Sequence, residues 1–265
     1  MRTSLYSFLL VAFIAWSFKA PLIDDNYKVI KVNGSIQVKK TGKALQQGDV
    51  FKESTSLQFN SPDSKATVIN GEKGRFVITS QSNSSKGNNL IPAINNIASR
   101  GGAILTIIDL QNFFQGNVCV IEHMKVKIAS ADFKMNKENF FYLEYTYKGE
   151  KIRKMLSNVG DSLLLDKTEI YKVDGKPIDA PDSPEVSLYY MLDKSKGTVR
   201  PIGTFNLIFP KEAELKEEVK IILGEFKSKS ASQKIDEVMS YITEFYGKAD
   251  KDNVKPWLAN NFGVK

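Results

Sequence analysis

Short runs of alternating hydrophobic and polar residues, separated by turn residues, fill the chain between residues 27 and 79. The first, Tyr27 to Val32, leads through Asn33-Gly34 into Ser35 to Lys40. Alternation with a period of two is typical of β-strands, and Asn-Gly between such runs predicts a tight hairpin, because both central residues of that turn adopt positive φ. Further turns are predicted at Gln47-Gly48-Asp49 and Asn70-Gly71. Residues 25–80 therefore predict a small all-β module, either a sandwich or a solenoid-like stack.

A second β-rich region runs from Val118 to Phe209. Its most hydrophobic run, Phe140 to Tyr147, predicts an aromatic strand that is covered on both faces. Lys148-Gly149 and Asp174-Gly175 predict tight turns between neighbouring strands. Since consecutive hairpins produce antiparallel pairing, we expect an antiparallel sheet here.

Residues 81–117 separate these two regions and are predicted to be a linker and connecting segment. Gln81 to Asn89 is polar with almost no apolar residues, which is typical of an exposed loop. Farther along, Ala103 to Ile108 predicts a strand and Asp109 to Phe114 a single helical turn.

Helical periodicity is found only at the end of the chain. Two stripes of apolar residues recur at helical spacing, first Leu215, Val219, Ile222, Leu223 and Phe226, then Ile235, Val238, Met239, Ile242, Phe245 and Tyr246. Within the first stripe, Lys220 to Leu223 also fits a strand. Ser232 is the predicted N-cap of the second helix and Gly247 its stop. Trp257, Leu258 and Phe262 form a last apolar group, and we expect it to pack against the second β region. The predicted fold is mainly β (α+β), with residues 118–265 forming an antiparallel β-rich domain that ends in a helical tail.

The first residues have the layout of a secretory signal peptide. Arg2 is the only charged residue before Lys19, and the apolar run Phe8 to Phe18 lies between them. A basic start followed by an apolar run of about 7–15 residues is typical of export signals, whereas a membrane span needs about 20. We predict a signal peptide over residues 1–17, cleaved after Ser17, with an uncleaved signal anchor as the alternative. The protein is then expected to be periplasmic or secreted, with no cysteine placed for a lipid anchor.

Five segments of the first β region form a recurring pattern: Val32 to Ile36, Ala44 to Val50, Leu57 to Phe59, Ala66 to Ile69 and Gly74 to Phe76. They correspond to a V-x-G-x-I strand, an L-x-x-G-D turn, an apolar strand, an A-x-V strand and a glycine turn before another strand. This pattern resembles the periplasmic β module of FecR-type signal-transduction proteins, in a cell-envelope protein of a bacterium. FecR-type proteins bind a sigma factor through a cytoplasmic segment before their membrane span. Because only Met1 to Ser7 precede the apolar run here, the resemblance implies an envelope β module without anti-sigma activity.

Composition limits the chemistry that the chain can perform. It has 37 Lys and Arg against 30 Asp and Glu, a net charge of +7, and 42% hydrophobic residues, which indicates a folded globular protein. A single Cys excludes an internal disulfide and cysteine-rich zinc sites, and a single His excludes multi-histidine metal centres. The positive charges are scattered, without a basic stripe that carries aromatic residues, so we expect no nucleic-acid partner.

No catalytic arrangement emerges from the remaining candidates. Cys119 and His123 are predicted on one face of a strand, where residues four apart lie roughly 13 Å from each other and cannot form a nucleophile and base. We expect Cys119 to be buried and structural. Neither a Gly-x-Ser-x-Gly elbow, nor a phosphate-binding loop, nor a calcium loop is present in the sequence. We therefore expect no enzymatic activity and no cofactor.

These observations predict an exported protein-interaction or signalling module of the bacterial cell envelope. Its partners are expected to be envelope proteins, contacted through exposed sheet edges of the first β region. Further candidate contact residues are Tyr142, Tyr145 and Tyr147 of the aromatic strand, and Arg100, which lies either in a turn or at an anion contact. Two alternatives stay open: a protein that binds or acts on envelope glycans, and a structural accessory subunit of a secretion or motility machine.

Overall fold

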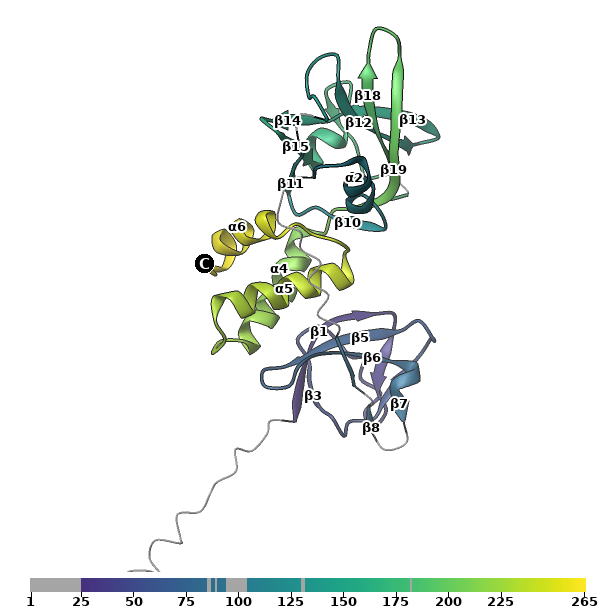
Figure 1. The fold of residues 1–265 in the computed structure, drawn as a ribbon. Coiled ribbons are helices and arrows are strands. Elements are labelled where there is room, and N and C mark those ends of the chain that lie inside the picture. The colour runs from purple at the N-terminus through teal and green to yellow at the C-terminus, as the bar shows by residue number, and fades with distance from the viewer. Residues whose placement is uncertain (1–24, 85–86, 89, 94–103, 130–131, 182) are drawn as a thin grey trace, which may run out of the picture. The chain divides into compact units, whose positions relative to one another are not determined.

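The computed structural model describes residues 25–84, 87–88, 90–93, 104–129, 132–181 and 183–265 (Figure 1). The predicted signal peptide, residues 1–17, lies outside these ranges. The chain divides into two compact units, Met1–Pro92 and Ala93–Lys265. Strands account for 40% of the structure and helices for 25%, which confirms a mainly β protein with helices at its C-terminal end.

The N-terminal unit is built on a five-stranded antiparallel sheet in the order β3-β1-β5-β6-β9. Its strands are β1 (Asn26–Asn33), β3 (Val50–Lys52), β5 (Lys65–Asn70), β6 (Gly74–Thr79) and β9 (Ile91–Pro92). The strands β2 (Ile36–Val38) and β4 (Leu57–Phe59) pair with each other, and after the 3-10 turn η1 (Ser80–Ser82) so do β7 (Asn83–Ser84) and β8 (Gly87–Asn88). Ile36 and Leu57 of the small β2-β4 sheet join Tyr27, Val29 and Val68 of the large sheet in one buried core.

The predicted hairpin at Asn33-Gly34 is wrong. The chain turns there, but β1 pairs with β3 and β5, whereas β2 pairs with β4 in the other sheet. A tight hairpin turn needs positive φ at both central residues, and of this pair only Gly34 has it, at 79°. Asn33-Gly34 is therefore a corner that carries the chain from one sheet to the next.

The C-terminal unit contains two larger sheets that enclose one core. The five-stranded sheet has the order β10-β19-β18-β12-β13, and the three-stranded sheet the order β11-β15-β14. Their strands are β10 (Asn117–Cys119), β11 (His123–Lys127), β12 (Phe140–Tyr147), β13 (Glu150–Met155), β14 (Ser157–Val159), β15 (Ser162–Asp166), β18 (Glu185–Asp193) and β19 (Thr198–Ile208). A short helix, α3 (Lys167–Ile170), and the small hairpin β16 (Lys172–Val173) and β17 (Lys176–Pro177) complete this part.

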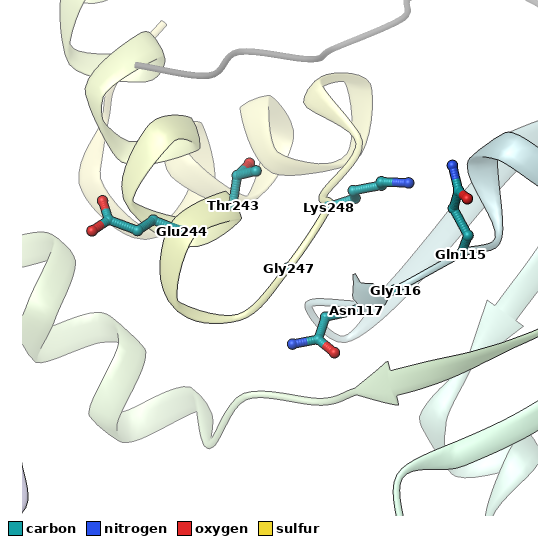
Figure 2. A pocket seen from close by; sticks show the side chains of 7 residues that line it. All are labelled: Gln115, Gly116, Asn117, Thr243, Glu244, Gly247 and Lys248. Carbon is teal, nitrogen blue, oxygen red and sulfur yellow. The ribbon is translucent and has the colours of Figure 1, made fainter. Parts of the chain in front are cut away.

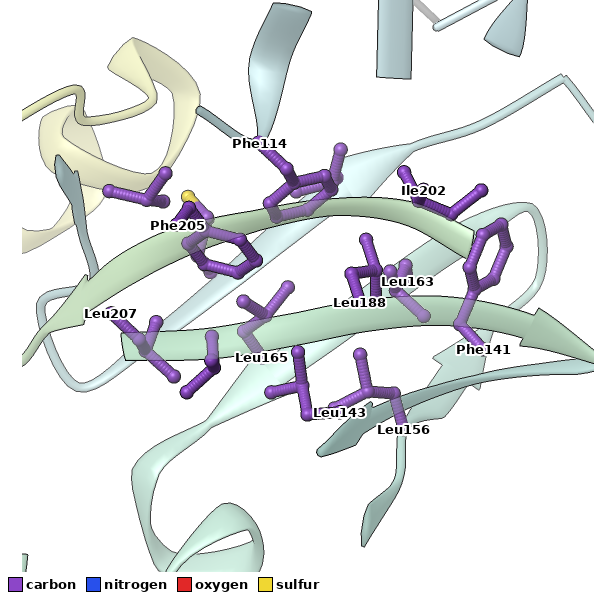
Figure 3. Packing of buried hydrophobic residues seen from close by; sticks show 14 of the residues in the cluster. Phe114, Phe141, Leu143, Leu156, Leu163, Leu165, Leu188, Ile202, Phe205 and Leu207 are labelled. Carbon is purple, nitrogen blue, oxygen red and sulfur yellow. The ribbon is translucent and has the colours of Figure 1, made fainter. Parts of the chain in front are cut away.

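Side chains from both sheets meet in the core (Figure 3). Leu143 of β12 and Leu188 of β18 represent the five-stranded sheet, and Leu163 and Leu165 of β15 the three-stranded sheet. All four are at most 1% exposed. At about 25 cal/mol per Å² of apolar surface removed from water, this burial is the main force that holds the two sheets together.

Two tight turns of the C-terminal unit are confirmed. Lys148-Gly149, with φ of 50° and 83°, joins β12 to β13, and Asp174-Gly175, with φ of 50° and 76°, joins β16 to β17. In both, the two central residues have the positive φ that the turn requires. Pairing in the large sheet is antiparallel as predicted, except that β10 runs parallel to β19.

The predicted connecting segment, residues 81–117, divides between the two units. The strands β7, β8 and β9 belong to the N-terminal unit, whereas the helix α2 (Ile107–Phe113) belongs to the C-terminal one. Of the strand predicted over residues 103–108, Ala103 lies outside the described residues and Ile104 forms an isolated bridge with Ile128. The remainder is wrong, because Thr106 caps the N-terminus of α2 by accepting a hydrogen bond from the Asp109 amide. Leu110 and Phe114 then enter the core, so this segment is part of the domain rather than a linker.

Three helices follow the sheets: α4 (Glu212–Glu225), α5 (Ala231–Phe245) and α6 (Lys251–Phe262). The N-cap of α5 is Ser230 and not the predicted Ser232, because Ser230 forms a reciprocal capping box with Gln233. Gly247 ends the helix as predicted, with a φ of 112°. The three helices pack in sequence, α4 on α5 and α5 on α6, and α6 also contacts β11. The last apolar group thus belongs to a third helix that lies against a strand.

Candidate protein-interaction site

The three candidate tyrosines of β12 lie on two different faces of the sheet. Tyr145 is 3% exposed, and its hydroxyl donates a hydrogen bond of 2.7 Å to the backbone oxygen of Ile170. Burial raises the pKa of the Tyr145 hydroxyl. Tyr147 lies on the same face of the sheet as Tyr145 and is half-buried against the core. Tyr142 is on the opposite face, where it stacks on Tyr189 at 5.1 Å between ring centroids. The three residues therefore form no common surface, and Arg100 lies outside the described residues.

Cys119 and His123 belong to different sheets, so the single strand predicted through both is wrong. Cys119 ends β10 and is 2% exposed, whereas His123 begins β11 and is exposed. Between them Glu122 has a φ of 60°, which no regular strand contains. Cys119 is buried as predicted, and this burial raises the pKa of its thiol.

The outer edge of β10 is covered by the segment that follows α5. The Cys119 amide donates to the backbone oxygen of Lys248, and the Lys248 amide donates to that of Asn117, both at 2.8 Å. Gly247 permits this approach, since a side chain at its position would collide with the Asn117 carbonyl. This edge of the five-stranded sheet is therefore closed.

The outer edge of β11 is covered as well. The side-chain amide of Asn253 in α6 bonds both backbone groups of Lys125, and Ile104 bonds Lys127 and Ala129 at 2.8 Å each. A strand edge saturated in this way cannot pair with another chain.

The opposite edge of the five-stranded sheet, β13, is open. The Leu156 amide donates to the Phe141 oxygen at 2.9 Å, which sets the alternation of the β12-β13 ladder. In an antiparallel ladder alternate residues point their backbone groups away from the partner strand, and here these are Lys151, Arg153 and Met155. Within the described part of the chain nothing pairs with these outward groups.

This open edge continues into the second sheet. Leu156 is 5% exposed and anchors the chain in the core, and β14 follows immediately as the edge strand of the three-stranded sheet. Two large apolar side chains of this stretch, Met155 and Val159, are 60% and 58% exposed. We call residues 150–159 the open edge.

The charges of the open edge surround one carboxylate. Glu144 of β12 accepts from the Arg153 Nε at 2.8 Å and from the Lys151 Nζ at 3.0 Å. These two hydrogen bonds hold the pKa of Glu144 below its ordinary value, and the bond from Arg153 has the larger effect. Since two cations share one anion, this side of the edge carries an excess positive charge.

The sheet edges of the N-terminal unit, which the sequence suggested as contact sites, are short. The edge strands of its large sheet are β3 with three residues and β9 with two. Each offers fewer outward backbone groups than the six-residue β13.

A shallow hollow of about 450 Å³ lies beside β10, lined by Gln115, Gly116, Asn117, Thr243, Glu244, Gly247 and Lys248 (Figure 2). Its amine, the Lys248 Nζ, donates to the backbone oxygen of Asn112 at 3.0 Å. Desolvation lowers the pKa of Lys248. Glu244 is the single carboxylate of the lining, so the hollow lacks the paired carboxylates that glycoside hydrolysis requires.

Comparison with models of known protein families finds no match, and comparison with curated proteins finds no similar sequence. In the described ranges, no group of three or more His, Cys, Asp or Glu side chains is arranged to hold a metal ion. None of the described helices has the length and apolar character needed to span a membrane.

The sequence predicted only part of what makes β13 an open edge. The predicted turn at Lys148-Gly149 implies a strand after it, and the charges of Lys151, Arg153 and Lys154 are typical of an edge. Which strands would be covered was not visible, because the covering residues Lys248 and Asn253 lie more than 120 positions away from β10 and β11 in sequence.

Proposed function

We propose that the protein is an exported, non-enzymatic protein-recognition component of a bacterial cell envelope, and that it binds an extended segment of a partner protein along β13. The observation that carries this proposal is the row of outward backbone groups on Lys151, Arg153 and Met155. An added strand would satisfy them and extend the five-stranded sheet, which is a common mode of peptide recognition.

The treatment of the other edges supports this choice. Soluble proteins usually protect strand edges because open edges invite aggregation. In the C-terminal unit, backbone and side-chain groups close β10 and β11, while β13 stays open over six residues. Because β10 and β11 are closed and β13 is not, the open edge of β13 supports a binding site.

Location in the envelope rests on the sequence. The basic and apolar start of the chain supports export, and the FecR-like pattern over residues 25–80 supports a signalling role in the periplasm. The glycan alternative drew on the aromatic strand, where Tyr145 is buried and hydrogen-bonded in the core. No observation favours that alternative over strand addition.

The test is selection of displayed random nine-residue peptides on the full-length protein, followed by binding measurements with two variants. Met155→Pro removes an outward N–H at an edge position where proline is tolerated, and Met155→Thr keeps that N–H. We expect the selected peptides to bind Met155→Pro at least tenfold more weakly than Met155→Thr. Failure to select any peptide, or equal binding to both variants, would overturn the proposal.

A second measurement avoids any effect on folding. Peptides methylated on the backbone nitrogens of alternate residues leave the protein unchanged but cannot complete a ladder. One of the two alternating methylation patterns should abolish binding, and the other should preserve it. Retained binding with both patterns would show that the peptides do not add as a strand.

A further inference from the structure

In β13 the residues whose backbone groups point outward include the two basic residues that contact Glu144. Lys151, Arg153 and Met155 have the same parity, so their side chains share one face of the sheet with Glu144 and Tyr142 of β12. In an added strand, the residues directly opposite these three would lie on that same face, with Cβ atoms about 5 Å away. Three side chains of the partner would therefore contact Lys151, Arg153 and Met155.

Two of the three positions favour negative charge. The side chains of Lys151 and Arg153 are 73% and 69% exposed, and both contact the single carboxylate of Glu144. Arg153 donates to Glu144 through Nε, and within the described residues its terminal guanidinium nitrogens form no hydrogen bond, so these donors are available to a partner. A carboxylate opposite either residue would neutralise the excess positive charge.

The third position favours an apolar residue. Met155 is 60% exposed, and across the ladder it lies opposite Tyr142, which is itself 7% exposed and stacked on Tyr189. An apolar side chain opposite Met155 would remove the thioether from water and extend this aromatic row.

A second copy of the same strand does not fit in the register that pairs all three outward residues. Antiparallel pairing of two β13 strands centred on Arg153 would place the two guanidinium groups opposite each other and Lys151 opposite Met155. Like charges directly opposite are destabilising, and basic edge residues are a known means of preventing self-association. The occupant is therefore a different chain of opposite charge.

We infer that the partner's segment carries acidic residues at two alternate positions, facing Lys151 and Arg153, and an apolar residue at the next alternate position, facing Met155. This inference rests on the proposed function, since it specifies the chemistry of the strand that the open edge accepts.

The probes are synthetic peptides with the order Thr-Glu-Thr-Glu-Thr-Val-Thr, its reversed sequence, and the same two peptides with Gln in place of Glu. Both orders are needed because an added strand can run parallel or antiparallel to β13. We expect one acidic peptide to bind the full-length protein at least fivefold more tightly than its Gln counterpart. Raising the salt concentration from about 0.05 M to about 0.5 M should remove most of this preference.

Matched variants locate the effect. Arg153→Gln and Lys151→Gln should each weaken the acidic peptide roughly twofold to fivefold and leave the Gln peptide unchanged, whereas Lys137→Gln, in a loop outside the open edge, should change neither. If acidic and Gln peptides bind equally well and both are lost in Met155→Pro, the inference fails while the proposed function stands. If neither peptide binds, the inference also fails, and the displayed-peptide selection alone decides the proposed function.

Discussion

The side-chain amide of Asn253 in α6 takes the place of a neighbouring strand for Lys125 in β11. The Lys125 amide donates to the Asn253 Oδ1 at 2.9 Å, and the Asn253 Nδ2 donates to the Lys125 oxygen at 3.2 Å. A carboxamide places an N–H donor beside an oxygen acceptor, the same pair that a strand residue presents to its partner, and the second N–H of Asn253 donates to Asp250 at 2.9 Å. This side chain thereby closes the edge of β11 at Lys125 and docks a helix on it.

Asn253→Ala should lower the free energy of unfolding by about 1–2 kcal/mol, because both backbone groups of Lys125 lose their partner. Denaturation in urea measures this effect. The control is Asn260→Ala in the same helix, at an exposed position, with an expected change within about 0.5 kcal/mol. Equal changes in the two variants would show that the edge contact contributes nothing to stability.

Gly34→Ala should destabilise the N-terminal unit by at least about 2 kcal/mol. Gly34 has a φ of 79°, and a Cβ there would lie 2.5 Å from the Oγ of Ser64, which accepts a hydrogen bond from the Ser35 amide. Gly48→Ala is the matched control, with a φ of 84° and open space around the added carbon. It should cost about 1 kcal/mol, from backbone conformation alone. Thermal unfolding of both variants compares the two costs, and a smaller loss at Gly34 would contradict the close approach of Ser64.

The ion pairs of Glu144 should make stability depend on acidity. The folded-state pKa of Glu144 is depressed, so the carboxylate stabilises the fold above its unfolded pKa of about 4.3 and loses that contribution as the pH falls through the lower folded value. Glu144→Gln should cost about 0.5–1 kcal/mol at pH 7, since both cations are largely exposed. Urea unfolding from pH 7 to pH 3 should show the difference from wild type shrinking toward zero. A difference that grows on acidification would reverse the assignment.

Cys119 should be unreactive in the folded protein. The residue is 2% exposed, and desolvation raises the pKa of its thiol, so the reactive thiolate is scarce at neutral pH. A chromogenic disulfide reagent should label it only after denaturant is added, with a rate that follows unfolding. Full labelling within minutes in native buffer would contradict its placement in the core.

Sequence pattern predicted local structure well where one residue type has a strong conformational preference. Lys148-Gly149 and Asp174-Gly175 form the predicted turns, and the stripe from Ile235 to Tyr246 forms a helix. The pattern failed at Asn33-Gly34, where a turn signal specifies a change of direction but not the strand with which the chain then pairs. It also failed at residues 103–108, where the Thr106 cap outweighed a β-branched run.

By itself the sequence determined the β-rich class, the helical end, the buried character of Cys119 and the absence of a multi-histidine or disulfide chemistry. These depend on composition and on periodicity, which are properties of neighbouring residues. Only the tertiary structure decided which strand edges are closed, which face each tyrosine of β12 occupies, and that β13 stays open. Those features depend on contacts between residues far apart in the chain, such as Asn253 with Lys125, and no local pattern records them.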